Sequence, residues 1–215
     1  MKKAFIFLLM AMIARVSSGG NTPSPCISCD SLQMKEGKAW LNGQPYTGKC
    51  ETYHATASRE GKPVIRESYF YKNGLRYGNF FTLDEKGNIT QEGNITSVVK
   101  KTEEGEIVIR TGNSVTYEYY ESGKMKSETK YIYSDEGIKT ISSTAWYETG
   151  KVKSTTTYNK FGNQEKYETF RPNGDKELLL IFEYTENQRN KYFTEYKWDE
   201  DGNKTVEKGC YSPKF

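Results

Sequence analysis

The feature that most constrains the fold is a turn glycine that returns along the chain with similar neighbours. An apolar or aromatic residue stands four positions before most of these glycines and eight positions after them. They are Gly61, Gly87, Gly123, Gly150, Gly174 and Gly202, at intervals of 26, 36, 27, 24 and 28 residues. A unit this short cannot bury its own apolar face, so neighbouring units must stack on one another. The sequence therefore predicts one array of repeats.

Each repeat is predicted to form a β-hairpin, because a second series of turn sequences falls between the glycines. This series reads LNGQ, KNGL, RTGN, DEGI, KFGN and, without glycine, ENQRN. The segments between turns are rich in Thr, Tyr and Val, which favour strands. Side chains alternate between the two faces of a strand. We therefore expect one face to carry Met125, Ser127, Thr129 and Tyr131 and the other to carry Lys124, Lys126, Glu128 and Lys130.

The predicted fold class is all-β, an extended antiparallel β-meander built from about six β-hairpin repeats and roughly twelve to fourteen strands. The interval of 36 residues between Gly87 and Gly123 is longer than the others. Residues 97–110 (SVVKKTEEGEIVIR) are therefore predicted to form an added or lengthened hairpin. No segment after the N-terminal apolar run shows apolar residues at helical spacing.

The N-terminus has the pattern of a secretory signal. Two lysines precede an apolar run from Ala4 to Ala14, and small residues follow where a signal peptidase cuts. This run is about half the ~20 residues that a membrane-spanning helix needs, and no later segment is long enough. We predict a signal peptide at residues 1–18, a cysteine-containing tail at 19–31 and the repeat domain at 32–215, in a periplasmic or secreted protein. Lipid attachment at Cys26 is disfavoured, because proline precedes it and the apolar run ends well before it.

Charge and cysteine usage follow from export. The chain has 31 basic and 28 acidic residues, and removal of residues 1–18 takes away three basic ones, leaving 28 of each. A neutral mature chain gives no argument for nucleic-acid binding. In an oxidising compartment the four cysteines are expected to form disulfides, in any of three pairings. The candidates are Cys26, Cys29, Cys50 and Cys210. A bond between Cys50 and Cys210 would require the sheet to close on itself, because an open meander separates them by many strands.

Three segments resemble a known family. LNGQPYTG (41–48), YKNGLRYG (71–78) and YYESGKMKSE (119–128) resemble the MORN-variant repeat, an aromatic-x-Asn-Gly turn with a second glycine, followed by Tyr-Tyr-x-x-Gly-x-aliphatic. The chain is similar to bacterial YwqK-type proteins over most of residues 32–211. The resemblance implies a β-hairpin repeat fold and an antitoxin-like role against a protein toxin. From residue 160 onward the repeats lack the second glycine of the pattern.

Residues of the kinds that perform catalysis or bind metals are scarce. His54 is the single histidine, and it lies in a predicted strand near a turn. DEDGN (199–203) resembles the start of a calcium loop, but Cys210 stands where the twelfth-position glutamate belongs, which favours a plain turn. No catalytic, cofactor-binding or metal-binding residue is predicted, and the chain is not expected to be an enzyme. A glycosidase pair among the carboxylates beside the turns is a distant alternative.

Aromatic residues recur at two levels of the repeat. Four positions before the turn glycines stand Leu83, Tyr119, Trp146, Phe170 and Trp198, and eight positions after them stand Tyr69, Ile95, Tyr131, Tyr158 and Phe182. Such residues either pack neighbouring repeats together or form a binding surface, and packing is the favoured interpretation. Trp146 in particular is expected to be structural.

Lysines are concentrated on the predicted charged face. We predict a basic partner-binding patch made of Lys124, Lys126, Lys130, Lys151 and Lys153, which would attract an acidic protein. The alternative is a solvated face that keeps a long sheet soluble. The predicted function is an exported repeat scaffold that binds another protein in an antitoxin- or immunity-like role, with a toxin as the candidate partner. The rival prediction is a cell-surface module that binds glycan or lipid through its aromatic residues.

Overall fold

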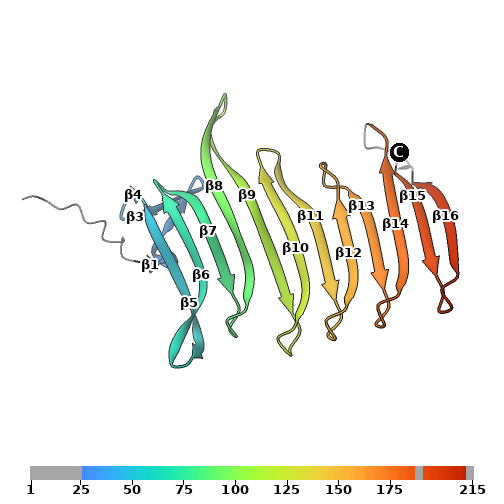
Figure 1. Cartoon of the computed structure of the whole chain (residues 1–215). Helices are drawn as coiled ribbons and strands as arrows, with labels where there is room; N and C mark the ends of the chain where they lie inside the picture. The colour runs from blue at the N-terminus through green and yellow to red at the C-terminus, as the bar shows by residue number, and fades with distance from the viewer. Residues whose placement is uncertain (1–25, 187–190, 212–215) are drawn as a thin grey trace, which may run out of the picture.

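The computed structural model describes residues 26–186 and 191–211, so the predicted signal peptide and the start of the tail lie outside the described residues. Thirteen strands form one main sheet in the order β1-β5-β6-β7-β8-β9-β10-β11-β12-β13-β14-β15-β16, and β2, β3 and β4 form a small sheet (Figure 1). Among the described strands only β1 pairs in parallel, with β5, and each later neighbour is antiparallel and next in sequence. The all-β antiparallel meander is confirmed, and its ends, β1 and β16, do not meet.

The strands β1 to β4 at the N-terminal end are short, and β5 to β16 are longer. The elements are β1 (Ile27–Ser28), the 3-10 helix η1 (Cys29–Ser31), β2 (Gln33–Lys35), β3 (Lys38–Leu41), β4 (Gln44–Pro45), β5 (Gly48–Arg59), β6 (Lys62–Lys72), β7 (Leu75–Leu83), β8 (Ile89–Thr102), β9 (Gly105–Tyr119), β10 (Met125–Ser134), β11 (Gly137–Trp146), β12 (Val152–Tyr158), β13 (Gln164–Phe170), β14 (Lys176–Tyr184), β15 (Lys191–Trp198) and β16 (Lys204–Tyr211).

The turns at the lower edge of the sheet in Figure 1 explain the recurring glycine. In the turn at 147–151, the Tyr147 N–H donates to the Lys151 carbonyl, and the Gly150 N–H donates to the Tyr147 carbonyl, both at 2.8 Å. The φ angle of Gly150 is 89°, a left-handed conformation that glycine adopts at little cost. The same pair of hydrogen bonds closes the turns that contain Gly87, Gly123, Gly174 and Gly202.

One predicted turn is wrong. The RTGN sequence at 110–113 lies inside β9, because β8 and β9 form one lengthened hairpin that turns between Thr102 and Gly105. Gly112 is there because the strands approach closely: a Cβ atom at this position would lie 2.1 Å from the Asn94 carbonyl oxygen. The lengthened hairpin predicted for residues 97–110 is confirmed.

Bulges beside four of the lower turns change which face the side chains take. In the β9–β10 pair, Met125 lies opposite Tyr119 and Ser127 lies opposite Glu118, so Lys126 is an extra residue. Tyr119 and Glu118 are adjacent on β9 and point to opposite faces, and Met125 and Ser127 therefore do too. The expected alternation after the turn is wrong at this point. Equivalent register shifts occur in the pairs β7–β8, β11–β12 and β13–β14.

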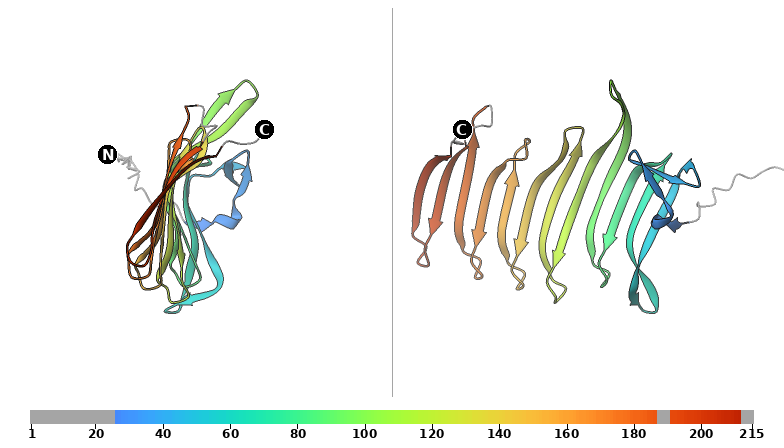
Figure 2. Two further views of the ribbon diagram at one scale, coloured as in Figure 1. Left: turned by 90° about the vertical axis from the view of Figure 1, so that its right-hand side faces the viewer. Right: turned by 180° about the vertical axis from the view of Figure 1, so that it is seen from behind.

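The small sheet covers one face of the main sheet at its N-terminal end (Figure 2). Its Ala39, with Tyr46 just after β4, packs with Cys50 and Tyr71 of the main sheet in a buried cluster. We call the face that carries this cluster the covered face and the opposite one the open face. From β10 onward, Phe182 is the one described hydrophobic side chain that is buried, so this half of the sheet is a single layer.

Candidate interaction surface

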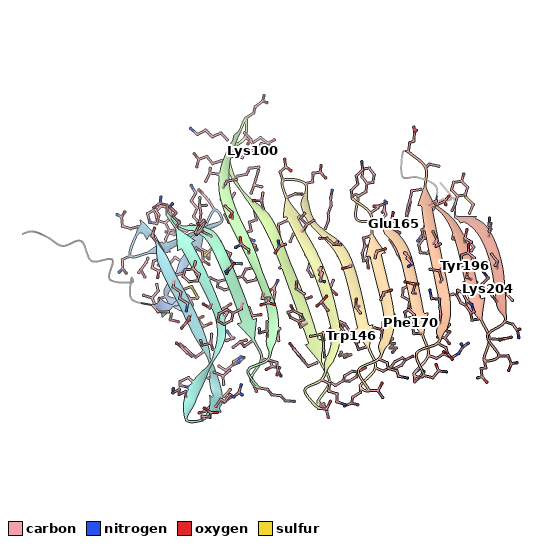
Figure 3. All side chains as sticks on the ribbon, in the orientation of Figure 1. Lys100, Trp146, Glu165, Phe170, Tyr196 and Lys204 are labelled. Carbon is pink, nitrogen blue, oxygen red and sulfur yellow. A yellow bond between two sulfur atoms is a disulfide. The ribbon has the colours of Figure 1, made fainter. Side chains whose placement is uncertain are left out.

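A row of apolar side chains crosses the lower end of the open face. Leu83 lies opposite Ile89, Tyr119 opposite Met125, and Trp146 opposite Val152, and Phe170 continues the series on the next strand. The bulges put both members of each pair on the same face. We call these seven residues, one from each of the strands β7 to β13, the apolar row. Figure 3 shows Trp146 and Phe170 at equivalent places on their strands.

The apolar row is accessible along its length. Ile89 and Met125 keep 37% and 36% of their surface exposed, and the other five members are half-buried. With neighbouring strands about 4.8 Å apart, seven strands extend the row over roughly 29 Å. The small sheet lies on the opposite face, so no described second layer covers the row.

The row ends at its C-terminal side in alternating lysines and aromatic rings. Lys176 lies opposite Phe170, and its Nζ atom is 5.9 Å from the Phe170 ring centre and 5.7 Å from that of Trp198. Lys204 lies opposite Trp198 and 5.1 Å from the Tyr196 ring centre. We call Lys176, Trp198 and Lys204 the basic end of the row. Its two ammonium groups lie beside aromatic rings, which attract cations.

A carboxylate holds the first lysine of the basic end in place. Lys176 Nζ is 2.7 Å from one Glu168 oxygen, and Lys166 Nζ is 2.8 Å from the other. Burial opposes ionisation of Glu168, but the hydrogen bonds from Lys166 and Lys176 outweigh it and lower the pKa of the carboxyl group below its ordinary value. Glu168 is therefore ionised at neutral pH and fixes the position of Lys176.

Side chains at the lower turns join neighbouring hairpins. The Tyr120 hydroxyl donates to the Trp146 carbonyl oxygen, and the Tyr147 hydroxyl donates to that of Phe170, each at 2.7 Å. Arg171 makes the equivalent hydrogen bond to the Trp198 carbonyl oxygen. Each accepting carbonyl belongs to an aromatic residue of the apolar row or of its basic end. The backbone that carries these rings is thus tied from one hairpin to the next.

Each lysine of the predicted patch contacts a nearby group of its own. Lys126 lies 3.6 Å from Glu118, and Lys130 lies 3.0 Å from Glu128. The bulge places Lys126 on the same face of the sheet as Glu118. In the register of β9 and β10, Lys130 lies on the other face. The five lysines do not share one face. Their role in partner binding stays a prediction.

The remaining lysines of that patch contact the lower turns. Lys124 Nζ donates to the Glu148 carbonyl oxygen at 2.9 Å, and Lys151 Nζ donates to that of Asn173. Lys153 Nζ lies 5.8 Å from the ring centre of Tyr147. Lys124 and Lys151 therefore add to the contacts between successive turns at the lower edge.

The two predicted aromatic levels lie on opposite faces. Tyr69 stacks against Phe80 with ring centres 5.8 Å apart on the covered face, and the later members Tyr131 and Phe182 occupy the same face in the register. Trp146, from the other level, is half-buried on the open face. The sequence spacing predicted no difference between the two levels. The bulges beside the lower turns place them on opposite faces of the sheet.

One disulfide forms among the four candidate cysteines. Cys29 and Cys50 are bonded, with Cα atoms 4.9 Å apart, and this bond ties η1 to the main sheet. The bond excludes a pairing of Cys50 with Cys210, which lies in the end strand β16. Cys26 is exposed and outside the disulfide, and partial burial and the nearby Glu51 carboxylate raise the pKa of its thiol.

The residues considered for catalysis and metal binding have structural contacts. The His54 Nε2 atom lies 2.9 Å from the Leu83 carbonyl oxygen. Asp199 accepts hydrogen bonds from the Asn203 backbone N–H at 2.8 Å and from its side-chain amide at 2.9 Å, as expected for a plain turn. Within residues 26–186 and 191–211 no group of three or more His, Cys, Asp or Glu residues is placed to hold a metal ion. No helix in this part of the chain is long and apolar enough to cross a membrane.

No family model matches the sequence, and no curated protein matches it. A DUF3836 family protein from Parabacteroides distasonis aligns with 46% of this chain and 87% of its own, at 14% identity and a TM-score of 0.19. A porin-like protein from Bacteroides uniformis aligns with 74% of this chain and 57% of its own, at 14% identity and a TM-score of 0.23. At these TM-scores neither likeness carries an argument about this chain.

Proposed function

We propose that the chain is an exported repeat scaffold that binds another protein, and that the apolar row makes the contact. The observation that carries the proposal is the row itself, seven apolar side chains from seven successive strands on a face that no second layer covers within the described residues. Contiguous exposed apolar surface of this kind marks protein–protein contact sites. The hydrogen bonds between repeats hold the row rigid, which lowers the entropy cost of binding.

The basic end indicates the chemistry of the partner. A matching surface is apolar along most of its length and acidic where it meets Lys176 and Lys204. The resemblance to YwqK-type repeat proteins supports an antitoxin- or immunity-like role, with a toxin as the partner. The N-terminal signal pattern supports an encounter in the periplasm or outside the cell.

A charge placed in the row tests this proposal. Met125→Glu puts a carboxylate among the apolar side chains, and we expect affinity for the partner to fall about tenfold or more. The product of the neighbouring gene is the first candidate partner. Ile132→Glu is the matched control, because Ile132 lies on the same strand and face, is 44% exposed, and is outside the row. Equal binding by the two variants would remove the row from consideration as the contact surface.

A second candidate function has one specific observation in its favour. Phe170 and Trp198 flank the Lys176 ammonium group, and rings beside a cation suit the stacking of a sugar ring that carries an anionic group, or an anionic lipid head group. Binding to a glycan array or to anionic liposomes that Trp198→Ala abolishes, with an unchanged melting temperature, would favour this function. Binding to neither would leave protein recognition as the role of the surface.

A further inference from the structure

The β8–β9 hairpin extends beyond the upper edge of the main sheet as a two-stranded arm (Figure 1). On the side of β9 that faces β10, strand pairing ends where Gly112 meets Tyr133, whereas pairing with β8 continues to Gly105. Residues 105–111 of β9 therefore have a strand neighbour on one side only. We call this segment, with the sequence GEIVIRT, the free edge of the arm.

The arm carries apolar side chains that its own two strands leave accessible. Val98 and Ile107 are 46% and 48% exposed. A groove of about 410 Å³ lies beside the free edge, between Ile107–Arg110 and the tip of the β10–β11 hairpin. A two-stranded ribbon is only marginally stable in water, and a further strand can pair with an apolar free edge.

The free edge is complementary to itself. When two identical strands pair antiparallel about a two-fold axis normal to the sheet, a residue opposes its own copy at the axis, and its neighbours oppose each other's copies. With the axis beside Val108, Ile107 meets Ile109 of the second copy. Glu106 meets Arg110 of the second copy, and Arg110 meets Glu106 of the second copy. From Glu106 to Arg110, every pair is apolar with apolar or acidic with basic, and the outermost pair sets Gly105 against Thr111 of the second copy.

The existing pairs of the arm fit this register. Val99 lies opposite Val108 in the hairpin, so the paired arms would place four valines in one row across four strands. Lys101 lies opposite Glu106, which also contacts Lys38 at 3.3 Å. The carboxylate of Glu106 would thus be surrounded by cations once Arg110 of the second copy arrived.

The end strand of the main sheet lacks this property. In β16, two-fold pairing centred on Val206 would set Lys204 against Lys208 of the second copy. Pairing centred on Glu207 would set this glutamate against its own copy, and pairing centred on Lys208 would do the same for the lysine. Like charges directly opposite one another destabilise a strand pair. The contrast between the two edges shows that complementarity is not a general feature of the strands.

We propose that two copies of this chain associate through antiparallel pairing of their free edges, centred on Val108. The dimer would be a four-stranded ribbon, β8–β9 with β9–β8 of the second copy. This association uses a surface separate from the apolar row and does not depend on the proposed function. The contact is small, so we expect a dissociation constant in the micromolar range or weaker.

Charge reversal tests the proposal by sedimentation equilibrium of the purified chain over about 1 µM to 1 mM, in low salt. Wild type should show a monomer–dimer equilibrium. Arg110→Glu should weaken it about tenfold or more, because two attractive pairs become repulsive. The double variant Glu106→Arg, Arg110→Glu should restore dimerisation. An equimolar mixture of the single variants Glu106→Arg and Arg110→Glu should restore it too, as a dimer of the two. Lys100→Glu, on the other strand of the arm (Figure 3), is the control and should leave it unchanged.

Three results would overturn the proposal. Wild type could remain monomeric at every concentration, which would leave the free edge to some other protein. Arg110→Glu could dimerise as well as wild type, which would place the contact elsewhere. The double variant could fail to recover while its melting temperature matched wild type, which would exclude the Glu106–Arg110 register. Met125→Glu should not alter dimerisation. The test of the free edge and the test of the apolar row can therefore fail independently of each other.

Discussion

Replacing Tyr147 with phenylalanine removes one hydroxyl group that joins two neighbouring hairpins. This hydroxyl donates to the Phe170 carbonyl oxygen at 2.7 Å in a part-buried site. An intramolecular hydrogen bond of this kind contributes about 0.5–1.5 kcal/mol net, and an acceptor that stays partly shielded from water pushes the loss toward the upper end. We therefore expect Tyr147→Phe to lower the free energy of unfolding by about 1 kcal/mol.

The loss should be local as well as global. In this meander each hairpin pairs with its neighbours only, so a weakened contact between two hairpins lets those beyond it open more easily. Amide hydrogen exchange should become faster in β13 to β16, while β5 to β9 keep the wild-type rates. Urea denaturation measures the global loss, and the exchange pattern locates it.

Tyr192→Phe is the matched control for this experiment. Tyr192 is 45% exposed in β15, and no hydrogen bond of its hydroxyl is found within the described part of the chain. The control should leave both the stability and the exchange pattern unchanged. If Tyr147→Phe and Tyr192→Phe gave the same denaturation midpoint and exchange rates, the hydrogen bonds at the lower edge would not stabilise the array, and the inferred rigidity of the apolar row would lose its basis.

Three further predictions follow from the same contacts. Trp146→Ala should cost about 1–3 kcal/mol in urea denaturation, less than the ~3–5 of a fully buried tryptophan, because the ring is half-buried. Glu168→Gln should lower the melting temperature at pH 7; since the folded carboxyl has a pKa below its usual 4.5, its stabilisation is lost as the pH falls below that value, and the two melting curves should converge in acid. Non-reducing peptide mapping should recover a Cys29–Cys50 peptide, and reduction should destabilise the small sheet first, with about 3 kcal/mol lost from a loop of 21 residues; a Cys50–Cys210 peptide would contradict the open sheet.

The sequence by itself determined the succession of hairpins. The left-handed conformation needed at the lower turns is open to glycine at little cost, so Gly150 and its equivalents identify the turns without any tertiary information. Strand composition and the long interval after Gly87 likewise predict the meander and its lengthened hairpin. A glycine can also serve close approach of two strands, as Gly112 does, and local sequence does not distinguish this use from a turn.

The candidate surfaces depend on register, which only the tertiary structure decides. A bulge adds one residue and reverses the faces of the side chains beyond it, so Met125 joins the open face while Lys126 turns to the other. Residues distant in sequence are also brought together by strand pairing: Cys50 bonds Cys29 because β1 pairs with β5 and sets Ile27 opposite Cys50. The turns are set by local backbone preferences. The surfaces are set by which strands meet and in which register, and no local preference encodes that.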